Sequence, residues 1–378
     1  MDPRTGLPVV GMVGGGQLAR MTHQAAIALG QSLRVLATDP DDGAALVVAD
    51  VRIGHHTDLA ALREFAKGCD VVTFDHEHVP GEHIRALAAE GVTLLPGADA
   101  LRFSQDKRAM RERLTGLGVP VPRWAEVTSP GDVAAFAAGA GWPVVVKAVR
   151  GGYDGRGVWV LGPSDPVPDT ELIVEERVAL RRELAAVVAR SPFGQVAAYP
   201  VVETVQRDGI CVEVVAPAPG LAESRAVEAE RLAIELVSAL DVVGLLAVEL
   251  FETAGGLVVN ELAMRPHNSA HWTIEGARTS QFEQHLRAVL DYPLGDTSLT
   301  APFVVMANVL GGGPDNPMAV DERLHHLFAA EPSVKVHLYG KRVRPGRKIG
   351  HVTVLGTDLA DTRARAARAA RWLREGHE

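Results

Sequence analysis

The sequence predicts a chain of mixed α/β and α+β class, with a parallel α/β domain at the N-terminus followed by largely antiparallel sheet. Up to about residue 95, short apolar stretches alternate with helical patterns, which is typical of a parallel sheet. From residue 143 onward, strand-like stretches are separated by short turns, which favours antiparallel pairing. The 378 residues, 47% hydrophobic and 22% charged, suffice for two or three domains and exclude a largely disordered chain.

The N-terminal domain opens with a β-α-β pattern around a glycine-rich turn. An apolar stretch runs into Gly14-Gly15-Gly16, and an amphipathic pattern follows directly. Alternating apolar stretches then continue the parallel arrangement. The elements expected here are strand 9–13, helix 17–29, strand 33–38, strand 51–53, helix 58–66 and strand 71–74.

Later elements follow from turn signals and periodicity. A helix ends at Gly118 and Pro120, and a Thr-Ala-Gly-Gly turn at 253–256 indicates a hairpin. The expected elements are helix 99–117, strands 143–149, 157–161 and 171–175, three β-like stretches within 183–215, helix 221–240, strands 245–252 and 257–263, helix 280–290, a β segment at 302–355 and helix 358–374.

The charge balance restricts the partners of the chain. Lys and Arg number 38 against 47 Asp and Glu, a formal net charge of −9, which disfavours nucleic acid or a membrane surface as a partner. No apolar run approaches the roughly 18 residues that cross a bilayer, and the N-terminus lacks a signal-peptide pattern, so we expect a cytoplasmic protein. Any anionic ligand must therefore be met by a local basic site.

The glycine-rich turn permits one alternative function. Gly14-x-Gly16-x-x-Ala19 follows a strand and opens a helix, and Asp39 lies about twenty residues further on, as in a dinucleotide-binding fingerprint. Such a turn also occurs where only tight packing is needed. An NAD-dependent oxidoreductase built on residues 9–39 therefore stays open as an alternative.

A second glycine-rich stretch favours phosphate binding. Residues 151–157 read GGYDGRG and follow Lys147, which lies within the apolar run VVVKAV. Backbone N–H groups of such a loop can wrap phosphate oxygens, and a lysine among valines is costly without an anionic partner. A long hairpin turn would explain the glycines but not Lys147.

Two carboxylates indicate a divalent cation. Glu249 and Glu261 lie in strands joined by the Gly255-Gly256 turn, so a hairpin can place them side by side. Adjacent carboxylates repel, and Mg²⁺ bound by one or two carboxylates plus substrate phosphates is a natural occupant. The alternative is a pair of exposed acids on an edge hairpin, which their apolar neighbours disfavour; Asn260 offers a further oxygen ligand.

Two basic clusters complete the candidate site. Arg265, His267 and Asn268 follow the hairpin directly, and a guanidinium with an imidazole and an amide suits a small planar oxyanion. Neither His267 nor His271 is spaced as a zinc ligand with a cysteine. Residues 341–348 gather five basic side chains and resemble a phosphate cradle, although a solvated basic turn would look similar.

Six strings occur together that carry a family resemblance. They read GGGQLARM (14–21), TFDHEHV (73–79), GGYDGRG (151–157), NELAMRPHNSAHWT (260–273), SQFEQH (280–285) and RPGRKIGHV (344–352). Together they closely resemble the N5-carboxyaminoimidazole ribonucleotide synthase family of the ATP-grasp superfamily, from about residue 9 to 355. The last two strings separate this family from biotin carboxylases and from the formate-dependent transformylase.

The resemblance implies an ATP-grasp fold with a biotin-carboxylase-like N-terminal domain. The implied parts are an N-terminal domain at 1–100, an ATP-grasp domain at 101–295 with a lid at about 124–182, and a C-terminal portion at 296–378. The implied reaction is the ATP-dependent carboxylation of 5-aminoimidazole ribonucleotide by bicarbonate through carboxyphosphate, a carbon–nitrogen ligase step of purine biosynthesis. Another ATP-grasp carboxylase or transformylase, or a noncatalytic ATP-binding regulator, stays open.

The resemblance also implies residue roles. Arg265, His267 and Asn268 would hold bicarbonate and carboxyphosphate, and Glu249 and Glu261 would bind Mg²⁺. The implied ATP contacts are Lys107, Lys147, Gly152, Tyr153, Asp154, Gly155, Arg156, Gly157, Val158, Glu175, Glu176, Arg177, Val178, Glu183, Gln206, Asn260 and Glu261. The implied ribonucleotide contacts are Gly15, Gln17, Leu18, Glu77, Tyr153, Asp154, Arg156, Arg265, Lys341, Arg347 and Lys348.

Two departures from the family pattern bear on these roles. Lys107 stands where arginine is common, which keeps the charge and loses the planar fork, and Gln206 stands near a frequent histidine. By analogy with the family, and because two-fold symmetric oligomers are the commonest, we expect a homodimer acting on small molecules.

Overall fold

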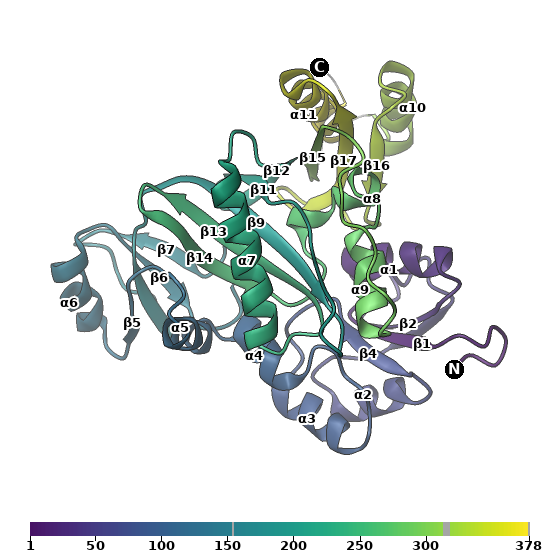
Figure 1. The fold of residues 1–378 in the computed structure, drawn as a ribbon, viewed down its shortest axis with the longest axis horizontal. Helices are drawn as coiled ribbons and strands as arrows, with labels where there is room; N and C mark the ends of the chain where they lie inside the picture. Colours follow the sequence, from purple (N-terminus) through teal and green to yellow (C-terminus); the bar gives the residue numbers. More distant parts are fainter. Residues whose placement is uncertain (153–154, 313–317, 377–378) are drawn as a thin grey trace.

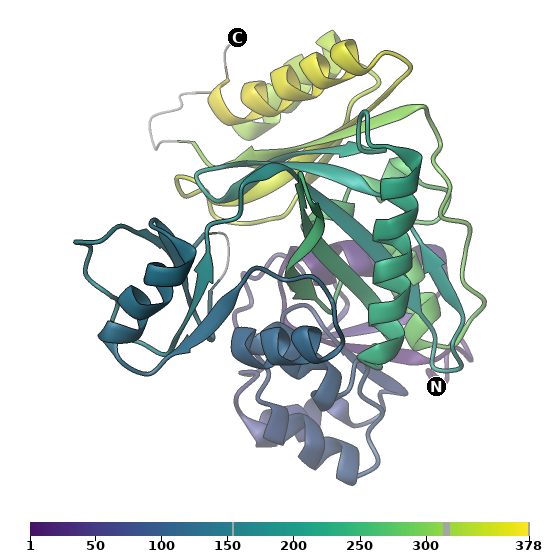
Figure 2. The ribbon, with the colours of Figure 1, turned by 60° about the vertical axis from the view of Figure 1, so that its left-hand side comes forward.

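Three β-sheets organise the chain in the computed structural model, which describes residues 1–152, 155–312 and 318–376 (Figure 1). The N-terminal sheet lies beneath a large central sheet, and a small third sheet projects to one side. Figure 2 shows the projecting sheet at the left, clearly separated from the C-terminal helices, which lie above the central sheet. None of the helices in the described part of the chain combines the length and apolarity that a membrane span requires.

The N-terminal sheet is entirely parallel, as the alternation predicted. Its strand order is β3-β2-β1-β4, so β1 lies in the interior, and all five of its residues are buried. Its elements are β1 (Val9–Val13), α1 (Gln17–Ala28), β2 (Ser32–Ala37), β3 (Asp50–Ile53), α2 (Leu59–Ala66), β4 (Val71–Phe74) and α3 (Gly81–Ala89).

The prediction of a single helix at 99–117 is wrong, because two helices occupy this stretch. These are α4 (Ala98–Gln105) and α5 (Lys107–Gly116), and Asp106 between them is extended, with φ −132° and ψ 106°. The Asp106 carboxylate accepts a hydrogen bond from the Ala109 N–H at 2.9 Å, which caps α5. The Lys107 N–H donates to the Val149 carbonyl at 2.9 Å. The break therefore ties the start of α5 to the projecting sheet.

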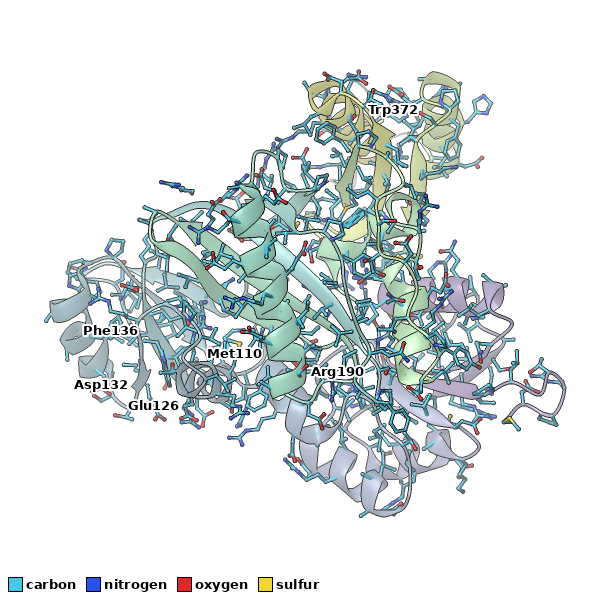
Figure 3. All side chains as sticks on the ribbon, viewed as in Figure 1. Met110, Glu126, Asp132, Phe136, Arg190 and Trp372 are labelled. Atoms are coloured by element: carbon cyan, nitrogen blue, oxygen red, sulfur yellow. The ribbon has the colours of Figure 1, made fainter. Side chains whose placement is uncertain are left out.

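The projecting sheet corresponds to the expected lid and is antiparallel throughout, in the order β5-β8-β6-β7. Its elements are β5 (Trp124–Val127), α6 (Pro130–Ala140), β6 (Val144–Ala148), β7 (Val158–Leu161) and β8 (Leu172–Glu176). Phe136 on α6 packs against its small core, where Figure 3 labels it. The glycine-rich stretch lies between β6 and β7 in the chain.

The central sheet has nine strands and crosses the expected boundary at 295/296. Its main path runs β14-β13-β9-β11-β12-β15-β17-β16, and β10 pairs with β9. Its strands are β9 (Leu180–Arg190), β10 (Val196–Ala198), β11 (Val202–Arg207), β12 (Ile210–Ala216), β13 (Gly244–Thr253), β14 (Gly256–Ala263), β15 (Phe303–Leu310), β16 (Lys335–Leu338) and β17 (Lys348–Gly356). The three-domain division stays a prediction, since β15 pairs directly with β12.

Two further expectations about this part of the chain are corrected. The β segment expected at 302–355 is interrupted by α10 (Val320–Ala330), and the stretch 183–215 contains parts of four strands where three were expected. The remaining helices are α7 (Glu223–Ala239), the 3₁₀ turn η1 (Asn268–Ala270), α8 (Thr273–Gly276), α9 (Gln281–Val289) and α11 (Leu359–Glu375). Trp372 of α11 donates its indole N–H to the Arg323 carbonyl at 2.9 Å, which joins α11 to α10 (Figure 3).

Candidate active site

A cavity of about 1440 Å³ is lined by residues of all three sheets. It brings together most residues singled out in the sequence: Gly15, Gln17, Leu18, Glu77, Lys107, Lys147, Gly152, Gly155, Val158, Glu175, Glu176, Arg177, Val178, Glu183, Gln206, Glu249, Asn260, Glu261, Arg265, His267, Asn268, Lys341 and Lys348. Arg156, Gly157 and Arg347 do not line it, and Tyr153 and Asp154 lie outside the described residues. Arg347 is exposed and donates to the Arg342 carbonyl at 3.3 Å.

The two carboxylates expected to be adjacent are cross-strand partners. Glu249 on β13 lies opposite Glu261 on β14, and the register shifts immediately after Glu249. This bulge adds one residue to β14, so Asn260 and Glu261 both line the cavity although neighbours in a regular strand face opposite ways. The expected juxtaposition is therefore present, and a backbone irregularity adds the amide of Asn260 to it.

The electrostatics of this pair favour a bound cation. Burial, reinforced by Glu261, raises the pKa of Glu249 to about 7. Burial opposes the charge of Glu261 too, but Lys107, which pairs with it directly, keeps the pKa of Glu261 below its ordinary value. Lys107 offsets the negative charge of Glu261 only. A divalent ion between the two carboxylates would relieve the repulsion between Glu249 and Glu261. Two carboxylates with an amide oxygen thus fit a hard cation that also binds phosphate.

Lys147 has an anionic partner, and that partner is a protein carboxylate. Its Nζ lies 2.8 Å from Glu175 Oε2 and donates to Asn260 Oδ1 at 2.9 Å. Arg111 Nε binds the other oxygen of Glu175 at 2.7 Å, and neither Arg111 nor Glu175 is more than 3% exposed. Burial lowers the pKa of Lys147 despite Glu175. Sequence reasoning missed Arg111, whose only signal is an arginine on the apolar face of α5.

Arg265 is held by an acid from the N-terminal domain. Its Nε donates to Glu77 Oε2 at 2.6 Å and its Nη2 donates to Oε1 at 3.4 Å. Burial alone would raise the pKa of Glu77, but Arg265 lowers it to about 2. The pairing fixes the plane of the guanidinium across the interface between the N-terminal and central sheets.

His267 is a neutral imidazole beside the carboxylate pair. Burial and Arg265 lower its pKa to about 3. The Ser269 N–H donates to its Nδ1 at 3.4 Å, which leaves the ring proton on Nε2, 3.5 Å from Glu249 Oε1. The adjacent Asn268 exchanges two side-chain hydrogen bonds with Asn308 of β15, at 3.0 and 2.8 Å. Asn308 is a second residue that sequence reasoning missed.

The first glycine-rich turn is occupied by a carboxylate. The Gly16 N–H donates to Asp75 Oδ2 at 2.5 Å, and a Cβ at Gly16 would lie 2.6 Å from the same oxygen. Asp75 therefore takes the position at the start of α1 where a dinucleotide pyrophosphate would need free N–H groups, and its charge would repel that group. This contact weighs against the NAD-dependent alternative. Lys341 reaches the same turn and binds the side-chain oxygen of Gln17.

Four histidines line the same end of the cavity, and sequence reasoning did not assign them. Their rings are close: His55 stacks on His56 at 4.3 Å, and His76 lies 4.6 Å from His56 and 5.4 Å from His78, measured between centroids. Burial first, then the neighbouring rings, lower the pKa of His76 to about 3. The string TFDHEHV contains two of them, His76 and His78. It therefore pointed to this site, but no role was predicted for its histidines.

The second glycine-rich loop touches the central sheet. Gly155 lies against Gly209 in the β11–β12 turn, where a Cβ at Gly209 would come within 3.0 Å of the Gly155 Cα. Both glycines have positive φ, of 76° and 74°, so no other residue fits this approach without strain. Gly209 was missed, although an Asp-Gly pair between two strands is a turn signal.

Three family models match consecutive parts of the chain. The ribonucleotide synthetase preATP-grasp domain matches residues 7–105, the ATP-grasp domain matches residues 112–282, and the phosphoribosylaminoimidazole carboxylase C-terminal domain matches residues 304–365. With the fold and the paired carboxylates, these matches define a member of the ATP-grasp class of enzymes.

Relatives identify the family within this class. The chain is 62% identical over 379 residues to the N5-carboxyaminoimidazole ribonucleotide synthase of Mycobacterium tuberculosis (strain ATCC 25618 / H37Rv), covering 98% of this chain and 88% of the relative. The Corynebacterium ammoniagenes enzyme of the same name is 49% identical, with 97% and 92% covered. The chain belongs to the N5-carboxyaminoimidazole ribonucleotide synthase family, whose members are ATP-dependent ligases.

Solved structures agree with this assignment. The N5-carboxyaminoimidazole ribonucleotide synthetase of Thermus thermophilus superposes with a TM-score of 0.86 at 38% identity, covering 96% of this chain and 98% of that one. The Aspergillus clavatus N5-carboxyaminoimidazole synthase, in complex with ADP and 5-aminoimidazole ribonucleotide, gives 0.86 at 32% identity, with 97% and 98% covered. The fold and family predicted from the sequence motifs are confirmed.

Proposed function

We propose that this chain transfers the carboxyl group of bicarbonate to the exocyclic amine of 5-aminoimidazole ribonucleotide, with cleavage of ATP to ADP and phosphate. One observation carries the proposal. A single cavity contains the Glu249–Glu261 pair, the Arg265–His267 cluster and the two lysines Lys341 and Lys348. These suit a metal-bound nucleotide, a small oxyanion and a phosphate ester respectively. The Aspergillus clavatus relative, solved with ADP and 5-aminoimidazole ribonucleotide, supports the same ligands here.

Mg²⁺ fits the carboxylate pair as the resident cation. Glu249 and Glu261 would hold it. Asn260 donates from Nδ2 to Glu249 Oε2 at 3.4 Å, and its Oδ1, which accepts from Lys147 at 2.9 Å, would offer only its second lone pair to the cation. Among the described residues, no three His, Cys, Asp or Glu side chains are placed to hold a metal ion by themselves. The remaining ligands would then come from ATP phosphates and water. When bound, the cation neutralises charge on the transferring phosphoryl group.

Bicarbonate is a poor electrophile and needs activation. In the proposed reaction a bicarbonate oxygen attacks the γ-phosphorus and ADP leaves, which gives carboxyphosphate; loss of phosphate then yields CO2 beside the substrate amine. Arg265, already oriented by Glu77, would hold the carboxylate oxygens, and the neutral His267 would donate a hydrogen bond from Nε2. Positioning and water exclusion are the protein's main contributions.

The ribonucleotide would lie towards the N-terminal domain. Its phosphate would bind Lys341 and Lys348, which line the cavity, while Gly15, Gln17 and Leu18 would form the wall beneath it. The Gly16 N–H already donates to Asp75, so these lysines rather than that N–H would hold the phosphate. ATP would lie between β8 and the central sheet, against backbone groups of residues 175–178 and the carboxylate of Glu183.

One assay tests this assignment. ADP release is measured with Mg-ATP and bicarbonate, with and without 5-aminoimidazole ribonucleotide, and the carboxylated product is quantified. We expect ADP release that depends on the ribonucleotide and matches product formation. Release that is indifferent to the ribonucleotide would refute the substrate, and formate-dependent release would favour the transformylase alternative.

We also propose a homodimer in the cytoplasm. The dimer follows from the prevalence of two-fold symmetric oligomers, and the location follows from the use of ATP. Light scattering coupled to size exclusion measures the mass directly; a monomer of 40.2 kDa would contradict the dimer.

A further inference from the structure

Gln281 is fully buried at the start of α9 and directs its whole side-chain amide at the loop that carries His267. Its Oε1 accepts a hydrogen bond from the His267 N–H at 2.8 Å. Its Nε2 donates to the His267 carbonyl at 2.8 Å and contacts His271 Nδ1 at 2.9 Å. An amide has one acceptor group and two N–H donors, so this set uses both donors and the oxygen.

The same helix end adds a second tie to this loop. The Gln281 N–H donates to Thr273 Oγ1 at 2.9 Å, and that hydroxyl donates to the Ala270 carbonyl at 2.6 Å. His271 and Thr273 are fully buried, so none of these groups exchanges readily with water. The turn between His267 and Thr273 is therefore fixed from one side by the N-terminus of α9.

The imidazole of His267 needs such fixing because its contact with the carboxylate pair is weak. His267 Nε2 lies 3.5 Å from Glu249, a distance too long for a strong hydrogen bond. The orientation of the imidazole thus depends on its backbone and on Ser269, whose hydroxyl lies 2.8 Å from Nδ1. A shift of the His267 backbone by a fraction of an ångström would move Nε2 relative to Arg265 and the carboxylates.

We infer that Gln281 is a positioning residue, which clamps both peptide groups of His267 and so sets the imidazole for bicarbonate activation. Gln281 itself does not line the cavity, and it acts through the backbone of His267. The inference rests on the proposed function, because it assumes that His267 faces the activated bicarbonate. No bond is made or broken at Gln281 itself.

Gln284, one turn further along α9, is a matched control. It is also fully buried, and it clamps another backbone position in the same way: its Oε1 accepts from the Gly295 N–H at 2.8 Å and its Nε2 donates to the Gly295 carbonyl at 3.0 Å. Neither Gln284 nor Gly295 lines the cavity. Substitution of either glutamine removes a comparable clamp, but only one clamp holds the loop of His267.

The experiment compares Gln281→Met with Gln284→Met, since methionine preserves length and flexibility without the amide. Wild-type enzyme must first show ribonucleotide-dependent ADP release; if it does not, the proposed function fails and the inference falls with it. We then measure melting temperature, KM for bicarbonate and for ATP, and the ratio of ADP released to product carboxylated. Gln281→Glu keeps the volume and the acceptor for the His267 N–H but loses the amide donors.

We expect similar losses of melting temperature in both methionine variants. Only Gln281→Met should raise the bicarbonate KM or lower kcat by about tenfold or more and raise ADP per product, with the ATP KM within about threefold of wild type. Gln281→Glu turns a second oxygen towards the His267 carbonyl, so its bicarbonate kinetics should be impaired at least as much as those of Gln281→Met. This variant decides by the same criterion if Gln281→Met does not fold. Equal kinetic effects at both positions, or bicarbonate kinetics unchanged at position 281, would overturn the inference.

Discussion

Replacing Glu175 by glutamine tests the buried charge cluster beneath the proposed nucleotide site. One carboxylate serves two cations there, at 2.7 Å from Arg111 Nε and 2.8 Å from Lys147 Nζ. Glutamine keeps the volume and removes the charge, so both cations stay buried without their counter-ion. Because removal of one partner of a buried pair costs about 3–5 kcal/mol, and this partner is shared, we expect a loss at the upper end of that range.

The loss converts into a measurable shift. At roughly 2 °C per kcal/mol for a large chain, the melting temperature should fall by about 8–10 °C. Glu176→Gln is the matched control, since the same substitution at the next residue of β8 removes a pair with Arg123, which is 61% exposed. Exposed pairs contribute about 0–1 kcal/mol, so the control should melt within about 2 °C of wild type.

The pH dependence provides an independent check. Burial already lowers the pKa of Lys147, and loss of Glu175 lowers it further. A lysine whose pKa is depressed by folding binds fewer protons in the folded state than in the unfolded state, so the stability of the variant rises with pH towards about 10. The gap between variant and wild type should therefore narrow from about pH 7 to about pH 9.5. Equal melting of Glu175→Gln and Glu176→Gln, or a gap that widens with pH, would refute this account.

Three further predictions concern the proposed ligands. Glu261→Gln should abolish ADP release while the melting temperature stays within a few degrees of wild type, because it removes a metal ligand; retained turnover would contradict the metal assignment. Lys341→Ala should raise the ribonucleotide KM about tenfold more than the ATP KM. Arg347→Ala should change neither KM beyond about twofold, since the Arg347 guanidinium lies outside the cavity. Equal effects of the two variants on the ribonucleotide KM would contradict this placement. The Mg²⁺ concentration for half-maximal rate should rise severalfold from about pH 8 to about pH 6, because burial raises the pKa of Glu249 to about 7 and protons compete with the metal; a pH-independent requirement would contradict it.

The sequence predicted the parts of the site that depend on local pattern. The Glu249–Glu261 hairpin follows from two strand patterns and a glycine turn, so its register is set by nearby residues. The cost of a charge among valines correctly indicated that Lys147 needs an anion. The family strings identified the family, which the relatives confirm, while the domain bounds and the lid stay predictions.

Other features depend on contacts between distant segments, which local pattern does not encode. Arg111 meets Glu175 across 64 residues, and Asn268 meets Asn308 across 40, each through packing of elements from different sheets or helices. The sequence did not predict the break at Asp106, because the helical periodicity continues through this residue. The cap that begins α5 is a single side-chain hydrogen bond, which the periodicity does not reveal. Arg347 was assigned from the family resemblance, yet its side chain lies outside the cavity that Lys341 and Lys348 line.

A net charge of −9 conflicts at first sight with three anionic substrates, and the geometry resolves the conflict. Three cations of the cavity are each held by a carboxylate: Lys107 by Glu261, Lys147 by Glu175 and Arg265 by Glu77. A bare cation cluster would be costly to bury, whereas these pairs keep each cation oriented and nearly neutralised. An anion that enters the cavity must then replace the carboxylate as a partner of one of these cations. The carboxylate released in this way is stabilised most by binding a divalent ion. The pairing therefore favours nucleotide and metal binding together over a free anion alone, a selectivity that the total charge of the chain does not predict.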